Sequence, residues 1–443
     1  MRLSILMTLL LGSSAMAQVY DAVEIPPLDT GTHNWAFGLN DAGDVVGSSN
    51  IRDTAEARGF LWRNATLTDL GVPPCGNHSW ARAINESGLM AVTAVDCFGF
   101  SVTRRPFVHD GVTLTALPYG SSRTYVRDID SNGNIVGTMF IDQVIANWPI
   151  THAYLWDGTT ATDLGTLGGD FSQSLALNES GLVVGGAHIQ DNAEYHAFSW
   201  QFGTMQDLGT LGGRDSEAND VNEDGLIVGW AENLEGARRP VLWDQGAILD
   251  LGTLGSEVGE AEAVNDAGWI VGHSQDAGGN ERAFVRNPRR DLVNLNERVI
   301  SGATALVLQS AQDINGHGQI VGWGRRNGVS RAFVLSPHPV AMTTPSPGQA
   351  GQINTVRLTG GTPGERLYLV AGFQQGSAAV PGCQGLFFDM ADPRLVASDV
   401  ADGQGAVDLA IFVPAPLSGA TVKLQPLDHS ACRLGNRQDI TFN

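Results

Sequence analysis

The stretch Ser174-Leu-Ala-Leu-Asn178-Glu-Ser-Gly181-Leu-Val-Val-Gly185 decides the fold of this chain. Its Asn-Glu-Ser-Gly tetrad predicts a tight turn, because glycine adopts a positive φ at no steric cost. The apolar residues on either side predict two short β-strands, over 174–177 and 182–185. The stretch therefore indicates a β-hairpin.

The same phrase occurs seven times, at intervals of 43 to 50 residues. Its copies begin at Asn40, Asn85, Asp130, Asn178, Asn222, Asn265 and Asn315. Two further strands can be read in the clearest copy, over His196–Trp200 and Thr204–Leu208, before a Gly-rich connector over 209–213. Four short strands in roughly 40 to 50 residues are typical of one blade of a β-propeller.

We therefore predict an all-β chain with a seven-bladed β-propeller over residues 18–336. The last repeat lacks a fourth strand, and Tyr20–Ile25 is a lone strand at the other end of the chain. Pairing the two would close the ring and remove its exposed strand edges. The alternative is an open solenoid, which would need capping repeats.

The C-terminal part differs in character. Residues 337–349 form a Pro-rich linker, and residues 350–443 contain alternating strands that predict a small β-sandwich domain. It resembles the modules that end many secreted proteins of planctomycetes and myxobacteria, in the phrases Asn354-Thr, Thr359-Gly and Pro381-Gly-Cys383.

The N-terminus and the charge restrict location and partners. Residues 1–17 have Arg2, an apolar run and an Ala-Met-Ala ending, which predicts a signal peptide and a periplasmic, surface or extracellular protein. No later stretch is long and apolar enough to span a bilayer. The net charge of −21 over 443 residues excludes nucleic acid as a main partner.

The repeat phrases resemble a known family. His196-Ala197-Phe198 and the segments Asp163–Gly169 and Asp207–Gly213 (Asp-Leu-Gly-Thr-Leu-Gly-Gly) are similar to the HAF repeats of bacterial extracellular proteins. The resemblance covers about residues 19–336. It implies a secreted or surface protein and no established enzymatic activity.

Export makes the four cysteines candidates for disulfides. Pairing within regions is the simplest of three connectivities, so we expect Cys75–Cys97 and Cys383–Cys432.

Two carboxylate patterns have both a structural and a functional interpretation. Asp128, Asp130 and Asn132 mimic the start of a calcium loop, but the twelfth position is Met139, so a structural turn is favoured over a calcium site. The aspartates before each Leu-Gly are interpreted as turn formers, and the histidines that begin two third strands as structural. These residues are Asp69, Asp163, Asp207, Asp250, His152 and His196.

The function is less well defined by the sequence. No catalytic, phosphate-binding or dinucleotide-binding motif is present, and no cofactor is expected. We expect a non-enzymatic protein that binds an extracellular glycan or protein. The expected ligand face consists of loop aromatics, Phe98, Phe100, Trp148, Trp230 and Trp323. The alternatives are a propeller hydrolase or lyase acting on extracellular polysaccharide, and a purely structural envelope component.

Overall fold

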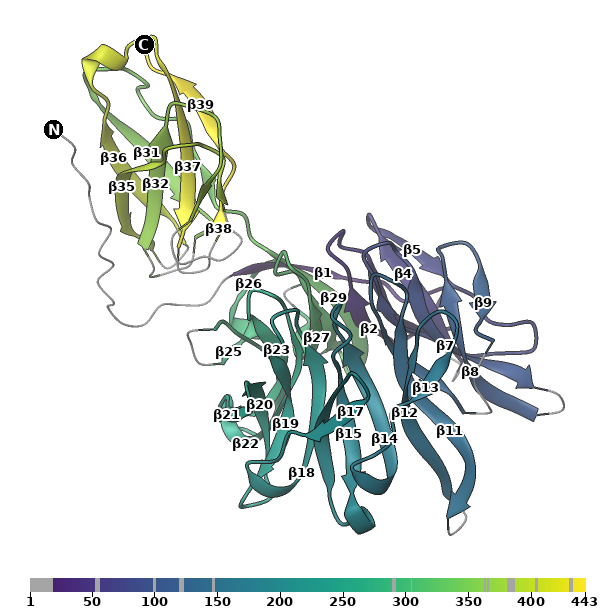
Figure 1. The fold of residues 1–443 in the computed structure, drawn as a ribbon. Coiled ribbons are helices and arrows are strands. Elements are labelled where there is room, and N and C mark those ends of the chain that lie inside the picture. The colour runs from purple at the N-terminus through teal and green to yellow at the C-terminus, as the bar shows by residue number, and fades with distance from the viewer. Residues whose placement is uncertain are drawn as a thin grey trace. The chain divides into compact units, whose positions relative to one another are not determined.

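The computed structural model describes residues 19–443 apart from 52–55, 99–100, 119–122, 146–147, 289–291, 304, 362–363, 365, 381–386, 403–404 and 430–432. Two compact units are present: the larger is Tyr20–Ser336, and the smaller is Pro337–Asn443 together with Val19. Both units consist of β-strands (Figure 1), which confirms the all-β prediction. The predicted signal peptide, residues 1–17, lies outside the described residues. Within the described part of the chain, no helix is both long and apolar enough to span a membrane.

In the larger unit, small antiparallel sheets follow one another along the chain, and each is a simple meander of four strands. The first three are β2 (Asn34–Leu39), β3 (Val45–Asn50), β4 (Ala57–Arg63) and β5 (Thr66–Asp69); β6 (Ser79–Ile84), β7 (Met90–Phe98), β8 (Ser101–His109) and β9 (Leu114–Ala116); and β10 (Tyr125–Ile129), β11 (Ile135–Ile145), β12 (Trp148–Trp156) and β13 (Ala161–Asp163). The next three are β14 (Gly168–Leu177), β15 (Val183–Ile189), β16 (Tyr195–Gln201) and β17 (Thr204–Asp207); β18 (Gly212–Val221), β19 (Ile227–Asn233), β20 (Arg238–Asp244) and β21 (Ala247–Asp250); and β22 (Gly255–Val264), β23 (Ile270–Asp276), β24 (Glu281–Arg286) and β25 (Val293–Asn294). Two single 3-10 turns, Gln190–Asn192 and Leu295–Glu297, accompany them.

The last sheet of the larger unit draws on both ends of the unit. Its strands are β27 (Val307–Ile314), β28 (Ile320–Arg326), β29 (Val329–Pro337), β1 (Tyr20–Glu24) and β26 (Val299–Gly302), in the order β26-β1-β29-β28-β27. Figure 1 shows β1, from the N-terminal end of the unit, beside β29. The strand β1 therefore lies beside β29 of the last repeat.

The repeated turn lies between the first and second strand of each of these sheets. Its glycine has a positive φ, as for Gly181 at 78°. The glycine that ends the phrase has a different function. A Cβ on Gly185 would collide with the carbonyl oxygen of Gln173 in the neighbouring strand, so glycine is required there for close approach of two backbones.

The turns of successive sheets are joined by side-chain hydrogen bonds. The Asn40 amide donates to the carbonyl oxygen of Asn85 (3.2 Å), and the Asn222 amide donates to that of Asn265 (3.1 Å). The same bond is made by Asn85, Asn178, Asn265 and Asn315, to Asp130, Asn222, Asn315 and Asn40 in that order. The bond from Asn315 to Asn40 (3.0 Å) connects the last sheet with the first. The carboxyl side chain of Asp130 has no N–H, so it does not form the equivalent bond to Asn178.

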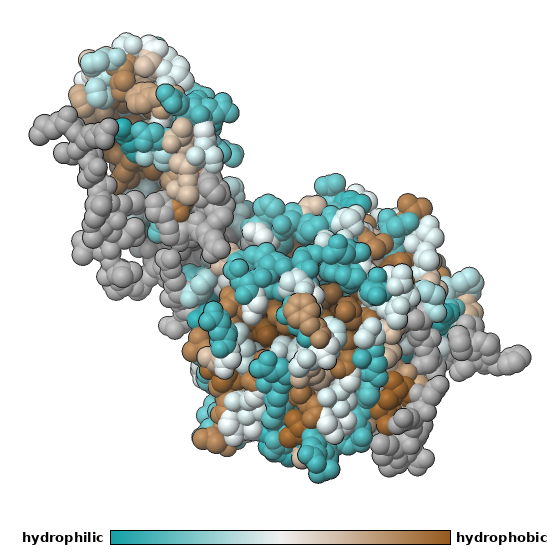
Figure 2. All heavy atoms as spheres, viewed as in Figure 1, coloured by the Kyte–Doolittle hydropathy of each residue, from teal (hydrophilic) through white to brown (hydrophobic). Residues whose placement is uncertain are grey.

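The apolar residues of the larger unit fill the interfaces between neighbouring sheets. One such core contains Ile25, Ala36 and Phe60 from the N-terminal end together with Ala332 and Val334 of β29. On the visible face of the molecule, hydrophobic residues occur in separate groups among hydrophilic ones (Figure 2). Sheet-to-sheet packing therefore accounts for the apolar positions of the repeat.

The smaller unit has two main sheets around one core. Its strands are β30 (Ala341–Met342), β31 (Ile353–Thr359), β32 (Arg366–Gly372), β33 (Ala378–Ala379), β34 (Phe387–Phe388), β35 (Arg394–Val400), β36 (Val407–Phe412), β37 (Thr421–Asp428), β38 (Arg433–Leu434) and β39 (Gln438–Thr441), with one 3-10 turn at Ala415–Leu417. The sheet β30-β31-β36 and the sheet built on β32 and β37 both contribute to this core, for example through Leu358, Leu409, Leu369 and Leu424.

One strand boundary differs from its prediction. The Gly-rich segment 209–213 was expected to be a connector, but β18 already begins at Gly212, opposite Asn233. The side chain of Thr210 accepts a hydrogen bond from Gly212 N–H and donates one to the carbonyl oxygen of Gly213, which fixes this segment against the strand.

Candidate active site

A chamber of about 210 Å³ is lined by the first strands of the seven sheets just described, β2, β6, β10, β14, β18, β22 and β27. Each strand contributes the two or three residues that precede its repeated turn. At roughly 30 Å³ per water molecule, this volume corresponds to about seven waters. The chamber therefore suits one small ligand or the terminal residue of a longer one.

A β-bulge in each first strand directs one side chain toward the chamber. In β14 the register shifts between Ser174 and Ala176, so Leu175 is the extra residue, and the other six first strands shift at the equivalent position. Bulges commonly redirect a side chain next to a functional site. The seven bulge residues are Phe37, Arg82, Arg127, Leu175, Asn219, Glu262 and Gln312, and all of them line the chamber. Unlike the turn residues, they vary among the repeats, and only arginine occurs twice.

One side of the chamber is cationic. Arg82 and Arg127 come from neighbouring strands, and the Arg82 guanidinium lies 4.6 Å from the centre of the Phe37 ring. Burial, followed by the charges of Arg127 and Arg104, lowers the pKa of Arg82 to about 10. The Arg127 Nε atom is buried without a hydrogen-bond partner. Among the described residues, no carboxylate forms an ion pair with either arginine.

This arrangement is costly for a purely structural role. A cation–π contact contributes roughly 0.5–2 kcal/mol, whereas burial of an unpaired ion costs several kcal/mol. Arg82 is half-buried, so solvent reduces this cost, and the contact with Phe37 offsets part of the cost that is left.

The opposite charge is carried by β22 and β23. Glu260 and the bulge residue Glu262 both belong to β22. His273 of β23 lies opposite Glu260, and its Nδ1 is 3.1 Å from the Glu262 Oε1 atom. One side-chain nitrogen or oxygen atom from each of these three residues lies within 4.8 Å of those of the other two, so the three could act together as ligands.

Burial would lower the pKa of His273, but its hydrogen bond to Glu262 and the charges of Glu262, Glu260 and Glu281 raise it to about 9. Burial also raises the pKa of Glu260, against the opposing effects of His273 and Arg238. Arg238 Nη1 is 3.1 Å from the Glu260 Oε1 atom. At neutral pH the cluster is thus a cationic imidazole held between two carboxyl groups.

The same three residues could hold a divalent cation, since oxygen and imidazole ligands suit several of these ions. A metal ion would have to displace the proton of His273. With a pKa of about 9, this competition weakens the apparent affinity roughly 100-fold at pH 7. The ion pair is therefore the favoured state of the cluster near neutral pH.

Three half-buried aspartates complete the chamber wall. Asp128, Asp220 and Asp313 directly follow bulge residues, and each accepts the N–H of its successor and one N–H of the next sheet. Burial raises the pKa of Asp128 to about 6 and that of Asp313 to about 7, and it raises the pKa of Asp220 well above its usual value. These carboxyl groups connect neighbouring sheets.

The residues of the suggested calcium loop already have protein partners. Asp128 accepts backbone N–H groups of Ile129 and Leu177, and Asp130 accepts two bonds from Asn134. The Asn132 amide is 3.4 Å from Glu179. The favoured interpretation as a structural turn is consistent with these contacts.

The aspartates before Leu-Gly are confirmed as turn formers. Each accepts the N–H of the glycine two residues later, at 2.7–2.8 Å, and each pairs with the residue that begins the third strand. The four pairs are Asp69–Arg58, Asp163–His152, Asp207–His196 and Asp250–Arg239.

The expected ligand-face aromatics are not brought together in one described surface. Trp230 is buried in β19 with Arg238 3.9 Å above its ring, and Trp323 lies half-buried in β28. Phe98 and Trp148 are in β7 and β12, but their side chains, and all of Phe100, lie outside the described residues. This ligand face stays a prediction.

The disulfides also stay predictions. The side chain of Cys97 and all of Cys383 and Cys432 lie outside the described residues. No free cysteine is present among the residues that the structure describes, which include Cys75.

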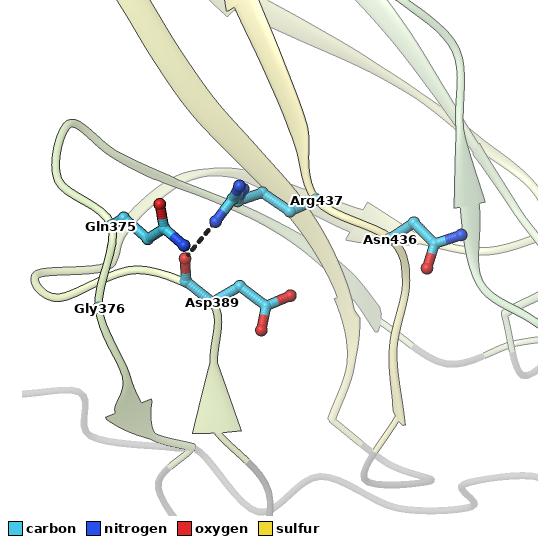
Figure 3. A pocket seen from close by; sticks show the side chains of 5 residues that line it. All are labelled: Gln375, Gly376, Asp389, Asn436 and Arg437. Carbon is cyan, nitrogen blue, oxygen red and sulfur yellow. Dashed lines mark hydrogen bonds between the residues drawn. The ribbon is translucent and has the colours of Figure 1, made fainter.

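The smaller unit has a pocket of about 410 Å³ (Figure 3). It is lined by Gln375, Gly376, Asp389, Asn436 and Arg437, and Arg437 donates to the Asp389 carbonyl oxygen (2.9 Å). Its charged groups are satisfied within the unit, since Arg437 also pairs with Asp439 and the Asp389 carboxylate accepts from Gln425. The chamber of the larger unit, with its unpaired arginines, is therefore the stronger candidate.

Comparisons with known proteins place these findings in context. No family model matches the chain, and no curated protein matches its sequence. Similar solved structures include a gluconolactonase from Xanthomonas campestris (14% identity, TM-score 0.36, 72% of this chain and 91% of that one) and TolB from Acinetobacter baumannii (9%, 0.38, 70% and 65%). Hydrazine synthase from Kuenenia stuttgartiensis is also similar (9%, 0.32, 95% and 68%). Scores this low assign no activity to the chain.

These findings contradict the prediction of a non-enzymatic binding protein. The similar structures include a hydrolase, the gluconolactonase. Independently, Arg82, Asp128 and Asp313 line the chamber and have shifted pKa values, and groups of this kind cluster at functional sites. The sequence did not reveal this site because its residues occupy the positions that do not repeat.

Proposed function

We propose that the larger unit is a seven-bladed β-propeller closed by its N-terminal strand, followed by a β-sandwich. Closure is supported by the bond from Asn315 to Asn40 and by the bond from Leu39 N–H to the Asp313 carboxylate (2.8 Å). It is also supported by the position of β1 beside β29. The N-terminal segment 1–17 and the HAF-like phrases support export of this protein.

We propose further that the protein is a hydrolase that removes terminal sugars from an extracellular polysaccharide. The observation that carries this proposal is the Glu260–Glu262–His273 cluster, whose Glu262 lines a chamber of about 210 Å³. A chamber of this size favours a chain end over an internal segment of a polysaccharide.

The two glutamates have different environments and thus different roles. Glycosidases that retain configuration place their two carboxyl groups roughly 5–5.5 Å apart, and those that invert need roughly 6.5–9.5 Å. One oxygen atom of Glu260 and one of Glu262 lie within 4.8 Å of each other, which is shorter than the separation that inverting enzymes need, so we assign the site to the first class. Glu260, whose pKa is raised by burial, is the proton donor, and Glu262 is the nucleophile.

In the first step the Glu262 carboxylate bonds to the anomeric carbon, the glycosidic bond breaks, and Glu260 gives its proton to the leaving oxygen. In the second step Glu260 takes a proton from water, and the water oxygen replaces Glu262 on the anomeric carbon. His273 positions Glu262 through the bond between Nδ1 and Oε1 (3.1 Å).

The test is turnover of a panel of bacterial and plant polysaccharides by the purified protein. We expect single sugars to be released, and Glu262→Gln to lower the rate at least about 100-fold. Asp244→Asn is the matched control, because Asp244 is an exposed carboxylate of β20, remote in sequence from the cluster. It should leave the rate unchanged.

Two outcomes would overturn this proposal. One is saturable binding of a polysaccharide without any turnover. The other is release of unsaturated sugar ends, which absorb ultraviolet light, since these products arise by elimination and not by hydrolysis.

A further inference from the structure

The cationic side of the chamber has no function in the hydrolysis just described. Arg82 and Arg127 are both bulge residues, so the backbone itself directs them toward the chamber. Arg104, whose Nη1 is 3.0 Å from the Tyr125 hydroxyl, adds a third positive charge close to Arg82. No carboxylate of the described residues pairs with Arg82 or Arg127.

The fold does not need arginine at these positions. The equivalent bulge positions of other sheets carry Leu175, Asn219 and Gln312, and the bulge is formed there all the same. A guanidinium that is surrounded by protein and lacks a counter-ion is expected where an anionic ligand binds. Two adjacent guanidinium groups match the planar, bidentate geometry of a carboxylate.

The net charge of −21 does not prevent this. Charges separated by more than about 8 Å are largely screened at physiological ionic strength, so the groups inside the chamber determine what binds there. The acidic groups that line the chamber are Glu262, which is bound to His273, and Asp128, Asp220 and Asp313, whose carboxyl groups accept backbone N–H groups.

We infer that Arg82 and Arg127 bind the carboxylate of an acidic sugar, so that the terminal residue accepted by the chamber is a uronate. The sugar part of this inference rests on the proposed hydrolase. The carboxylate site rests only on the two arginines and their surroundings. The sugar ring then lies between the arginines and Glu262, which all line the same chamber.

The experiment is a calorimetric titration of the full-length protein with D-glucuronate, its methyl ester, D-glucose and inorganic phosphate. The ester and glucose lack the charge and keep the ring, whereas phosphate keeps the charge and lacks the ring. We expect saturable binding of glucuronate, with the other three probes at least about tenfold weaker.

Three variants identify the binding groups. Arg82→Gln and Arg127→Gln should each weaken glucuronate binding by roughly 10- to 100-fold. Arg325→Gln removes the same charge from an exposed position of β28 and should not alter the affinity. Arg82→Gln should also keep or raise the melting temperature, because it removes an unpaired buried charge. A structural arginine would instead lower it.

The inference is overturned by any of three results: no saturable binding of glucuronate, equal binding of the methyl ester, or unchanged affinity in Arg82→Gln. If phosphate binds as tightly as glucuronate, the inference of an acidic sugar is overturned, and the arginines form a site for free anions. The proposed hydrolysis can fail separately. In that case the wild-type protein binds glucuronate through the arginines but releases no sugar from any polysaccharide.

Discussion

The carboxylates around His273 favour its protonated form, and this makes the stability of the protein depend on pH. Its pKa is raised from 6.5 to about 9 in the folded chain. The resulting stabilisation is fully present below pH 6.5 and is lost as the pH rises through 9. We expect His273→Gln to cost up to about 3 kcal/mol below pH 6.5 and little at pH 10.

Thermal melting of the wild type and the variant across this range measures the difference. His317→Gln, at an exposed histidine, is the control and should show a much flatter difference. A constant cost of His273→Gln at all pH values would mean that the imidazole acts by packing alone.

The stability of the protein also depends on pH through the carboxyl group of Asp313. Its carboxylate accepts the N–H groups of Leu39 and Ile314, yet burial raises its pKa from 3.8 to about 7. Its contribution to stability is complete below pH 3.8 and is lost as the pH rises through 7. Asp313→Asn keeps an acceptor oxygen without the charge, so it should raise stability at pH 8 by up to a few kcal/mol and not at pH 4.

Denaturant unfolding at both pH values tests this expectation, with Asp244→Asn as the control at an exposed carboxylate. A variant that is less stable than the wild type at pH 8 would show that the ionised form of Asp313 is needed between the sheets.

The sequence predicted the framework residues and missed the site residues for the same reason. Asn178 and Gly181 repeat in almost every copy because each turn has the same geometry. Gly185 also repeats, and its close approach to Gln173 marks the bulge beside it. Glu262 and Arg82 stand at the bulge position, three residues before each turn residue, where nothing repeats. The contact of Glu262 with His273 depends on strand register, which the sequence alone does not determine.

At the level of the elements, the chain of asparagine bonds between turns has one missing member. Asp130 cannot donate to Asn178, although the Ser131 N–H donates to the Glu179 carboxylate (2.8 Å), as the equivalent residue does in other turns. Asp130→Asn supplies the missing donor. We expect it to stabilise the protein by about 0.5–1.5 kcal/mol, the usual net value of one hydrogen bond.

The reverse change, Asn222→Ala, removes the donor to Asn265 and the acceptor of Leu226 N–H. It should destabilise the protein by about 1–3 kcal/mol, because two buried backbone groups lose their partners. Equilibrium unfolding of both variants measures these changes in stability. If Asp130→Asn is neutral and Asn222→Ala is costly, the bond within the turn matters and the bond between sheets does not.

At the scale of the whole larger unit, the proposed closure would determine whether the chamber exists. The chamber is lined by the first strands of all seven sheets, so Phe37 of the first and Gln312 of the last must stay together. These two sheets are linked by residues that lie more than 270 positions apart, as in the bond between Leu39 and Asp313. Activity and global stability should thus be lost together when the ring opens.

Ile25 offers the sharpest test of closure. It is fully buried in a core shared with Phe60 of the first sheet and Ala332 of the last, and its N–H donates to the Ala332 carbonyl oxygen (2.9 Å). Ile25→Ala should cost about 2–5 kcal/mol through the cavity it leaves. Val23→Ala is the matched control, since Val23 lies in β1 but is exposed.

Deletion of residues 18–28 behind an intact signal sequence extends the same test. It removes the buried Tyr20 and Ile25 and leaves β29 with an unpaired edge, so we expect an aggregated or protease-sensitive product. Removal of residues 340–443 should leave a soluble larger unit with its activity. If the protein without residues 18–28 melts at the wild-type temperature, or if Ile25→Ala and Val23→Ala cost the same, then the N-terminal strand does not hold the ring closed.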